Sequence, residues 1–422
     1  MKKMKWLLAI LMIAMTLAAC TTQTVTEIPA QEEIDTVPTE ATEEPVEATA
    51  TEAEEPVEET EVVEEPIDYF EDKAIIEYAQ GFTVEYFDNY KIVEVLTPWD
   101  FSEETFKYVL VQRGTEAPEG IENVDAVVEI PIETIIPLST TFIPFIEINH
   151  QMDTIVAVSD GTYISNETVL KKFADGELPA VGYGATVDVE TILNLEPDII
   201  MANGYGFPDY DTHPVLIDAG LTTIINGDYM ESTPLGRAEW GKFIALFYNT
   251  EKTANEFFSQ TVENYNEIVA LAADVENKPT VFFNTAWEGT WYMPGGNSYL
   301  SLMVQDAGGD YLWKDDPSTG SLYLSFEEVI EVAGENAEIW LHPGGFSFSI
   351  ADVLLSDERY GEFNALQNGM LYNNNAKLSA MGGNDYFESG VANPDVILAD
   401  LFSIFHPDLM PDHELQYYMK LD

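Results

Sequence analysis

The sequence predicts an α/β protein in which two lobes are joined by a long helix. Short, nearly continuous apolar runs, suited to buried parallel strands, alternate with helical stretches such as 188–195. This alternation stops at a long amphipathic region and begins again beyond it, so each side is expected to fold around its own sheet. The expected strands are 135–138, 154–158, 198–202 and 222–225 in the first lobe, and 280–284 and 338–341 in the second.

The connecting helix region spans residues 233–274. Thr233-Pro234 is typical of a helix start, because the hydroxyl caps the first turn and proline is tolerated at the first helical position. Apolar residues recur at helical spacing in two stripes, 240–247 and 254–265, and Asn249-Thr250 interrupts them. We therefore expect an N-terminal lobe over 67–232 and a C-terminal lobe over 275–422.

The N-terminal lobe is expected to contain a β-hairpin region at 82–114. The runs 82–87 and 90–95 alternate apolar and polar residues on either side of Asp88-Asn89, which predicts two antiparallel strands and a short turn. A third alternating run follows at 106–111.

The first residues of the chain predict export and a membrane anchor. A basic start and a short apolar segment, closed by Leu-Ala-Ala-Cys at 17–20, make a signal peptide over 1–19. The ending resembles a bacterial lipoprotein signal, which implies that Cys20 becomes the lipid-bearing first residue of the mature chain. The protein would then be exported and held on the outer face of the cytoplasmic membrane, at the cell surface or in a periplasm, through the lipid anchor only. A transmembrane helix is the alternative, although a bilayer needs about 20 apolar residues.

Residues 20–66 are expected to be the lipidated cysteine and a disordered acidic tether. Positions 21–66 hold 16 acidic residues and no Lys or Arg, so they bury too little apolar surface to offset the entropy of ordering. A specific acidic binding tail is the alternative. Cys20 is the single cysteine of the chain, so its acylation leaves no thiol for a disulfide, a metal site or a nucleophile.

The charge of the chain excludes one class of partner. The formal net charge is −59, and residues 67–422 alone carry 60 acidic and 14 basic residues. Nucleic acid binding needs a basic footprint, so no nucleic acid partner is expected. The same acidity argues against flat contact with anionic lipid, and it reflects either cationic partners or a salty habitat.

Two stretches of the chain resemble a known family. Residues 135–206 (IIPLSTTFIPFIEI to PDIIMANGYG) and 379–413 (SAMGGNDYFESG to HPDLMPDH) are similar to the substrate-binding proteins of ABC importers for iron complexes and cobalamin. The resemblance covers roughly residues 130 to 422. It implies two Rossmann-like lobes, a single long helix between them, a ligand cleft, an ABC permease dimer as partner and a monomeric protein. The tether and the 67–130 region are not explained by it.

Most candidate ligand-binding residues follow the predicted strands, because ligands of open α/β sheets bind beyond the carboxyl ends of the strands. Tyr183 instead lies in a Gly-Tyr-Gly turn just before the helix that carries Glu190. Several are aromatic residues in glycine-containing loops, and for each of them packing in the core is the alternative. The predicted ligand-binding residues are Thr141, Phe142, Tyr163, Tyr183, Tyr205, Trp287, Trp291, Tyr292 and His342.

The chemistry of these loops predicts the class of ligand. They contain no Arg or Lys, so a multiply anionic ligand is disfavoured, whereas aromatic rings suit a bulky neutral or cationic metal chelate. A ferric hydroxamate siderophore or a cobamide fits this description. His342 would ligate haem iron or donate a hydrogen bond, and a structural role is its alternative. No resident cofactor, bare-metal site or catalytic residue is predicted.

Two acidic residues are predicted to dock the permease. In the family that the sequence resembles, one acidic residue of each lobe meets basic residues of a permease subunit, and the matching positions are Glu190 and Glu327. Each follows an expected helix N-cap, Asp188 or Ser325, by two residues, where the helix dipole also favours a carboxylate for stability alone. Glu328 is expected to close a capping box with Ser325.

The predicted function is therefore that of an extracytoplasmic substrate-binding lipoprotein, which captures a ferric siderophore, haem or cobamide and delivers it to a permease. The protein is not expected to be an enzyme, because it has no nucleophile elbow, zinc-protease motif or phosphate-binding loop. A cell-surface hydrolase or an adhesion lipoprotein with a two-lobed α/β body remains the alternative.

Overall fold

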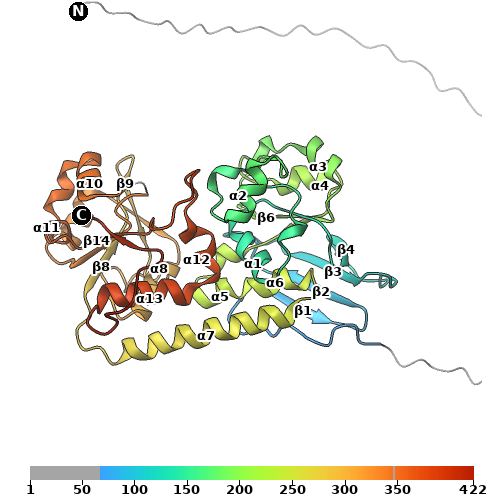
Figure 1. Cartoon of the computed structure of the whole chain (residues 1–422), viewed down its shortest axis with the longest axis horizontal. Coiled ribbons are helices and arrows are strands. Elements are labelled where there is room, and N and C mark those ends of the chain that lie inside the picture. The colour runs from blue at the N-terminus through green and yellow to red at the C-terminus, as the bar shows by residue number, and fades with distance from the viewer. Residues whose placement is uncertain (1–66, 346) are drawn as a thin grey trace, which may run out of the picture. The chain divides into compact units, whose positions relative to one another are not determined.

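The computed structural model describes residues 67–345 and 347–422 (Figure 1). The signal peptide, Cys20 and the acidic tether that the sequence predicts lie outside these described residues. Within the two ranges, no helix has both the length and the apolar character that crossing a bilayer requires.

The N-terminal lobe contains a three-stranded parallel sheet in the order β5-β6-β7 (Ile135–Pro137, Ile199–Ala202, Thr223–Ile225). All three strands are buried, as their apolar sequences predict. The strand predicted at 154–158 is wrong. Ile155 and Val158 each form one isolated parallel bridge, with Ile135 and Ala180, and because the two bridges have different partners the segment does not build a ladder.

A second sheet, in the order β1-β2-β3-β4, belongs to the same lobe (Phe82–Tyr86, Tyr90–Val95, Phe106–Gln112, Ala126–Ile130). The predicted hairpin is confirmed, since β1 and β2 pair antiparallel across Asp88-Asn89. Strand β4, which pairs parallel to β3, was not predicted. Val93 and Tyr108 of this sheet share one hydrophobic cluster with the residues around β5, so the 67–130 region is built into the lobe.

The C-terminal lobe contains a five-stranded sheet in the order β11-β8-β13-β14-β15 (Asp310–Tyr311, Thr280–Phe283, Ile339–Leu341, Leu371–Asn373, Met419–Lys420). All its pairs are parallel except the last. A small antiparallel sheet has the order β12-β10-β9 (Ser321–Leu324, Thr290–Pro294, Ala286–Trp287).

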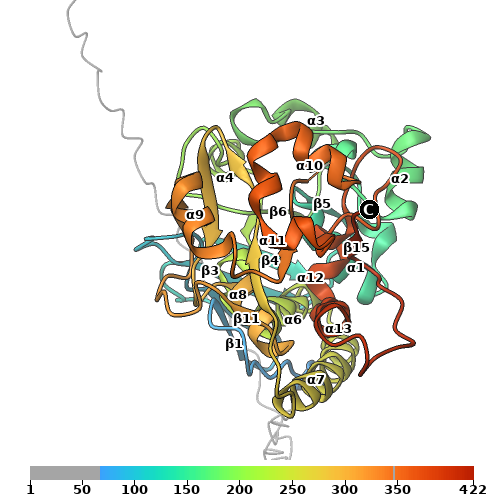
Figure 2. The same ribbon diagram turned by 90° about the vertical axis from the view of Figure 1, so that its left-hand side faces the viewer.

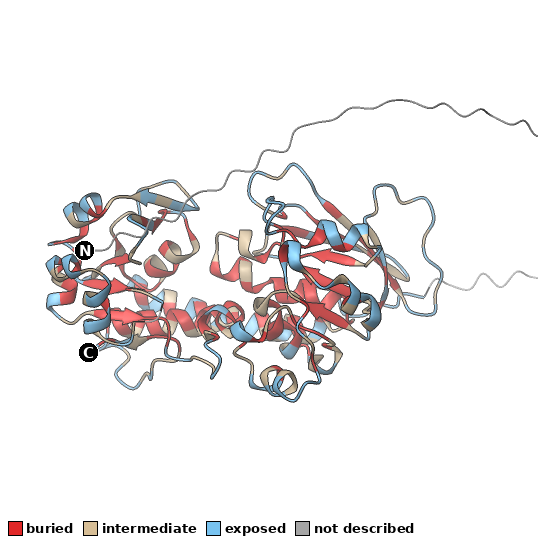
Figure 3. Ribbon diagram, turned by 90° about the horizontal axis from the view of Figure 1, so that it is seen from above, coloured by how far each residue is buried: buried red, intermediate tan, exposed pale blue. Residues whose placement is uncertain are grey.

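Helices pack on the sheets of both lobes, and Figure 3 shows the buried residues concentrated along the strands and on the helices that cover them. Helix α3 (Val189–Leu195) and helix α9 (Phe326–Ala333) begin where predicted, with Asp188 and Ser325 as capping residues. Ser325 and Glu328 form the expected capping box. The helices of the N-terminal lobe are α1 (Ile143–Ile148), α2 (Glu167–Ala174), α3 (Val189–Leu195) and α4 (His213–Asp218). Those of the C-terminal lobe are α8 (Tyr299–Asp306), α9 (Phe326–Ala333), α10 (Ile350–Ser356), α11 (Asn364–Gln367), α12 (Ser389–Ala392) and α13 (Pro394–Phe405).

The helix that joins the lobes is α7 (Glu251–Ala273), which is shorter than the predicted region 233–274. Two shorter helices, α5 (Pro234–Ala238) and α6 (Trp240–Leu246), precede it. Asn249, which has a positive φ of 55°, interrupts the helical backbone between α6 and α7. Every residue of α6 is buried, so this helix forms part of the core of the N-terminal lobe. Helix α7 contacts α6 near its beginning and lies beside α13 of the other lobe, as Figures 1 and 2 show.

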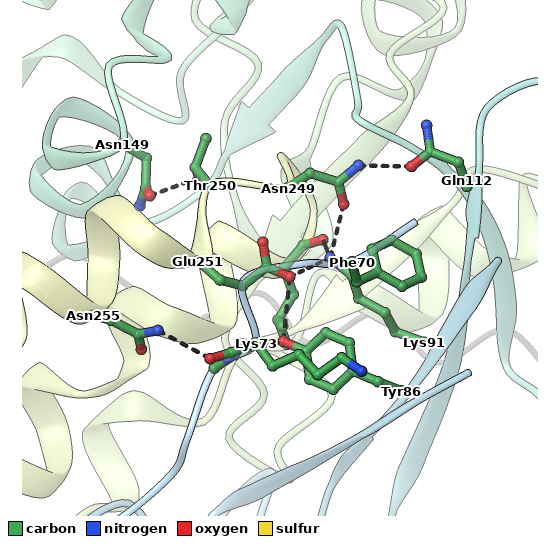
Figure 4. A network of polar contacts seen from close by, with 12 residues as sticks. Phe70, Lys73, Tyr86, Lys91, Gln112, Asn149, Asn249, Thr250, Glu251 and Asn255 are labelled. Atoms are coloured by element: carbon green, nitrogen blue, oxygen red, sulfur yellow. Dashed lines mark hydrogen bonds and ion pairs between the residues drawn. The ribbon is translucent and has the colours of Figure 1, made fainter. Parts of the chain in front are cut away.

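The beginning of α7 is fixed to the first sheet by a buried ion pair (Figure 4). Lys91 of β2 pairs with Glu251 and donates to the carbonyl oxygen of Leu246 and to Oδ1 of Asn249, both at 2.8 Å. Tyr86 Oη donates to the same carboxylate. Burial lowers the pKa of Lys91 to about 8, an effect that the Glu251 carboxylate opposes.

A second contact joins the lobes at α12. Val391 and Ala392 of this short helix belong to the hydrophobic cluster of the N-terminal lobe. Just before the helix, the Glu388 carboxylate accepts hydrogen bonds from the backbone N–H groups of Ser165 and Asn166, at 2.8 and 2.7 Å. Burial raises the pKa of Glu388 to about 7, although these two hydrogen bonds act in the opposite direction.

Candidate functional site

The strands of the N-terminal lobe lead into loops that line one aromatic pocket of about 430 Å³. Tyr205, Phe207 and Tyr210 follow β6, and Tyr229 follows β7, which is where the strand-end rule places a ligand. The residues that line this aromatic pocket are Asp100, Tyr183, Tyr205, Phe207, Tyr210 and Tyr229.

Two glycines bring Tyr183 into the aromatic pocket. Gly182 and Gly184 have φ angles of +73° and +60°, a conformation that other residues rarely adopt. A Cβ at Gly184 would lie 3.0 Å from the carbonyl oxygen of Asp209, so the turn closes on the loop after β6 because this residue has no side chain. The Gly184 N–H donates to Thr212 Oγ1 at 2.6 Å and fixes the contact.

The rings of the aromatic pocket offer apolar surface to solvent. The exposed fractions of Tyr183, Tyr205, Phe207 and Tyr210 range from 44% to 67%. The rings of Tyr205 and Tyr229 lie 5.5 Å apart, and Tyr229 Oη is held by a 2.6 Å hydrogen bond to the carbonyl oxygen of Gly204. Clustered exposed rings of this kind are typical of a binding surface rather than of a core.

The aromatic pocket adjoins a second pocket, of about 410 Å³, that both lobes line. Asp100 and Tyr229 belong to both pockets, and Asn284, Pro294 and Tyr299 contribute from the C-terminal lobe. A ligand on the aromatic rings would therefore meet the other lobe, which is the arrangement of a cleft.

A charge pair between half-buried Arg237 and buried Asp228 lies close to this cleft. Arg237 Nε is 3.6 Å from Oδ2 of the fully buried Asp228, and its guanidinium lies 5.8 Å from the centre of the Tyr299 ring. Burial raises the pKa of Asp228, and the neighbouring Arg237 opposes that change. Arg237 was not predicted because it lies within α5 rather than after a strand, and its charge is engaged by Asp228.

Of the predicted residues of the C-terminal lobe, Trp291 is wrong as a ligand-binding residue. Its ring is fully buried in the hydrophobic core, and its Nε1 donates to the carbonyl oxygen of Phe283 at 2.8 Å. The reason is the strand geometry of β10, in which neighbouring side chains point to opposite faces. Tyr292 is accordingly exposed and packs edge-on against Tyr323. Trp287 is 70% exposed but lines a different pocket, together with Arg359 and Tyr360.

His342 is half-buried among aromatic rings. It stacks on Tyr418, its Nε2 lies 2.8 Å from Tyr418 Oη, and Phe283 and Tyr386 meet it edge-on. Burial lowers the pKa of His342 to about 3, so the imidazole is neutral at physiological pH. Across residues 67–345 and 347–422, no group of three or more His, Cys, Asp or Glu side chains is arranged to hold a metal ion.

The three remaining predicted ligand residues do not line the aromatic pocket. The prediction of Phe142 as a ligand-binding residue is wrong, because this side chain is fully buried in the core of the N-terminal lobe. Thr141 is half-buried, and its hydroxyl is 2.9 Å from that of Ser139. Tyr163 is 61% exposed and ends a 3-10 turn at Gly161–Tyr163.

The two predicted docking residues are both exposed, one in the first turn of α3 and one in the first turn of α9. The Glu327 carboxylate lies 3.8 Å from Nη1 of Arg359, whose guanidinium also pairs with Asp357. Both acids therefore have side chains accessible to a partner.

Four residues of the aromatic pocket were missing from the prediction: Asp100, Phe207, Tyr210 and Tyr229. Tyr229 follows the run 222–225, so the strand-end rule applied to that strand identifies it. Phe207 and Tyr210 follow Tyr205 in the same loop. Asp100 carries no such signal, because it lies between two strands of the other sheet.

Comparison with known proteins agrees with this architecture. Residues 151–378 match the family described as Periplasmic binding protein. An uncharacterised lipoprotein of Methanocaldococcus jannaschii is 24% identical over 369 residues, covering 82% of this chain and 85% of that protein. A second uncharacterised lipoprotein of the same organism is 28% identical over 330 residues, covering 75% and 80%.

A solved structure shares the fold. It is that of a possible iron-binding (periplasmic solute-binding) protein from Staphylococcus epidermidis, with a TM-score of 0.51 and 19% sequence identity, covering 65% of this chain and 98% of that one. The two-lobed α/β architecture, the helix α7 between the lobes and the family match over more than half of the chain confirm the predicted resemblance. The chain belongs to the periplasmic binding protein family.

Proposed function

We propose that this protein captures a bulky metal chelate outside the cytoplasm and delivers it to the permease dimer of an ABC importer. The observation that supports this most strongly is the aromatic pocket, in which five rings from three loops line a space of about 430 Å³ that adjoins the gap between the lobes. Pockets that hold small molecules or cofactors have volumes of roughly 300–1,000 Å³ and are mainly apolar.

The charges around the pocket favour a neutral or cationic chelate. Among the residues that line the aromatic pocket and its neighbour, the charged side chains are Asp100 and Glu231, both acidic. A catecholate or citrate complex of iron carries several negative charges and would normally meet guanidinium groups. We therefore place a ferric hydroxamate or a cobamide first.

Haem is the less favoured ligand because of His342. Its Nε2 is already engaged by Tyr418, and the ring is enclosed by three aromatic neighbours. An axial ligand to haem iron would have to give up that hydrogen bond.

Native mass spectrometry tests the proposal directly. The purified chain is offered cobamides, haem and ferric siderophores together, and we expect one chelate to remain bound at a ratio of one per chain and to be recovered unaltered. Failure to retain any of them would contradict the proposed ligand class. Recovery of a chemically altered ligand would favour an enzyme instead.

A further inference from the structure

The loop between β2 and β3 lies against two of the three loops that carry the aromatic rings, the loops that follow β6 and β7. A Cβ at Gly204 would overlap the ring of Trp99, and one at Gly206 would lie 2.8 Å from Trp99 Cδ1. A Cβ at Gly227, after β7, would lie 2.6 Å from the carbonyl oxygen of Thr97. These glycines therefore allow the 67–130 region to pack closely against the loops that follow β6 and β7.

The Trp99 ring also packs against two other aromatic side chains. Its ring stacks on His213 at 5.3 Å and meets Phe106 edge-on at 5.9 Å. The ring is therefore fixed by α4 and β3 while it contacts Gly204 and Gly206, the residues on either side of Tyr205. Removing the Trp99 ring would free the loop that presents Tyr205.

The next residue, Asp100, contributes a carboxylate to the cleft. Asp100 is exposed, and it lines both the aromatic pocket and the pocket between the lobes. Among the described residues, its carboxylate has no hydrogen-bond or ion-pair partner, whereas Glu231 Oε1 already accepts from the N–H groups of Gln80 and Gly81 and from Trp240 Nε1. Asp100 is thus the lining carboxylate that is available to a ligand.

The negative potential of Asp100 reaches the rings. The pKa of Tyr229 is raised, first by burial and then by Tyr205 and the carboxylates of Asp211, Asp228 and Asp100. A cation on an aromatic face is stabilised by the ring quadrupole, and a nearby carboxylate adds a direct charge interaction.

We propose that the 67–130 region completes the ligand site, with Trp99 positioning the Tyr205 loop and Asp100 selecting a chelate that carries positive charge. This inference rests on the proposed binding of a metal chelate. It adds a part of the chain that the family resemblance leaves unexplained, and it assigns the sign of charge that the site prefers.

The test of Asp100 uses chelates that differ in charge but little in shape. Ferrioxamine B carries a pendant ammonium, and its N-acetyl derivative is neutral. Aquacobalamin is cationic, and cyanocobalamin is neutral. With the full chain, we expect the cationic member of whichever pair binds to bind more tightly than the neutral member. Asp100→Asn should reduce this preference by about threefold to tenfold.

The matched control is Glu103→Gln, which removes one exposed carboxylate three residues away that lines neither pocket. Glu103→Gln should leave the preference for the cationic chelate unchanged, because it alters the net charge of the protein by the same amount without changing the lining of either pocket. An equal preference in the Asp100→Asn and wild-type proteins would overturn the assignment of charge selection. Absence of binding by wild type to all four chelates would instead contradict the proposed function.

The role of Trp99 has a readout that needs no ligand. The N–H of Tyr205 donates to Asp211 Oδ1 at 2.6 Å, so its hydrogen exchange reports on the order of the loop. Trp99→Ala should speed exchange over residues 203–207 at least tenfold, whereas Phe101→Ala, which removes a ring that is 95% exposed, should not. Unchanged exchange in a folded Trp99→Ala protein would overturn the positioning role.

Discussion

Tyr205 and Trp291 occupy opposite environments, and their substitution separates binding from stability. Trp291 is fully buried, so Trp291→Ala should lower the free energy of unfolding by about 3–5 kcal/mol. Tyr205 is 44% exposed in the aromatic pocket, so Tyr205→Ala should weaken chelate binding about tenfold with little loss of stability. Chemical denaturation and ligand titration measure the two effects.

Tyr205→Phe is the control for this comparison, because it keeps the ring and should keep the affinity. If Tyr205→Ala binds the chelate as tightly as wild type, the aromatic pocket is not the site.

The residues of the site could be predicted only where a local rule applies. Tyr183 and Tyr205 were found because each is an aromatic residue flanked by glycines, Tyr205 after a strand and Tyr183 in a turn before a helix. Trp291 was misplaced because the sequence does not show which residue of the pair 291–292 faces inward until the strand register is known. Asp100 was missed because its place in the site depends on a contact between two sheets that are distant in sequence.

At the scale of the elements, the contact of Glu388 with the beginning of α2 is expected to depend on pH. Burial raises the pKa of Glu388 from its usual 4.5 to about 7, so between these values the folded protein holds a proton that the unfolded chain releases. Its contribution to stability is therefore full below pH 4.5 and is lost as pH rises to about 7, by roughly 3 kcal/mol. Glu388→Gln should remove this dependence in urea denaturation measured from pH 4.5 to 8.

The nearby acids provide a control for the Glu388 prediction. Asp385 and Glu147 both raise the pKa of Glu388, so Glu147→Gln should move the transition to lower pH without removing it. A difference between wild type and Glu388→Gln that stays constant across this range would contradict the prediction.

Helices α3 and α9 each carry an exposed glutamate two residues after the N-cap, Glu190 and Glu327, which leads to a prediction about the permease. Glu190→Lys combined with Glu327→Lys should abolish uptake while chelate affinity is unchanged, because repulsion from basic permease residues arises only at the docked interface. Transport into cells and ligand titration of the purified variant measure the two quantities.

Glu328 is the matched control for docking, since its Oε2 accepts from the N–H and Oγ of Ser325 at 2.7 and 2.8 Å. Glu328→Lys should lower stability by about 0.5–2 kcal/mol through loss of the cap, with uptake retained. Normal uptake by the Glu190→Lys, Glu327→Lys protein would refute the docking assignment.

The elements themselves were largely predictable from apolar runs and capping residues. Strands β6, β8 and β13 lie within their predicted ranges because buried parallel strands are apolar throughout. The run 154–158 has the same composition but makes only single bridges, because its pairing is decided by neighbours from two different segments. Composition cannot distinguish these outcomes.

At the scale of the whole molecule, the anchor is predicted to be Cys20 alone. Cys20→Ser should release the protein from the membrane into the soluble fraction, while the melting temperature of the body stays unchanged. Fractionation of cells, followed by mass measurement of the mature N-terminus, checks this. A Ser variant that remains membrane-bound with an unchanged N-terminus would disprove the lipoprotein assignment.

The position of α12 has a consequence for how the exported chain reaches its native state. Val391 and Ala392 come near the end of the sequence, yet they fill the core of the lobe that begins it. A chain that crosses a membrane amino-terminus first therefore emerges with that lobe incomplete, and the lobe closes only after nearly all of the polypeptide has passed. Contacts between residues so distant in sequence slow folding, so the chain is still flexible while it is translocated. The N-terminal and C-terminal lobes would then finish folding together.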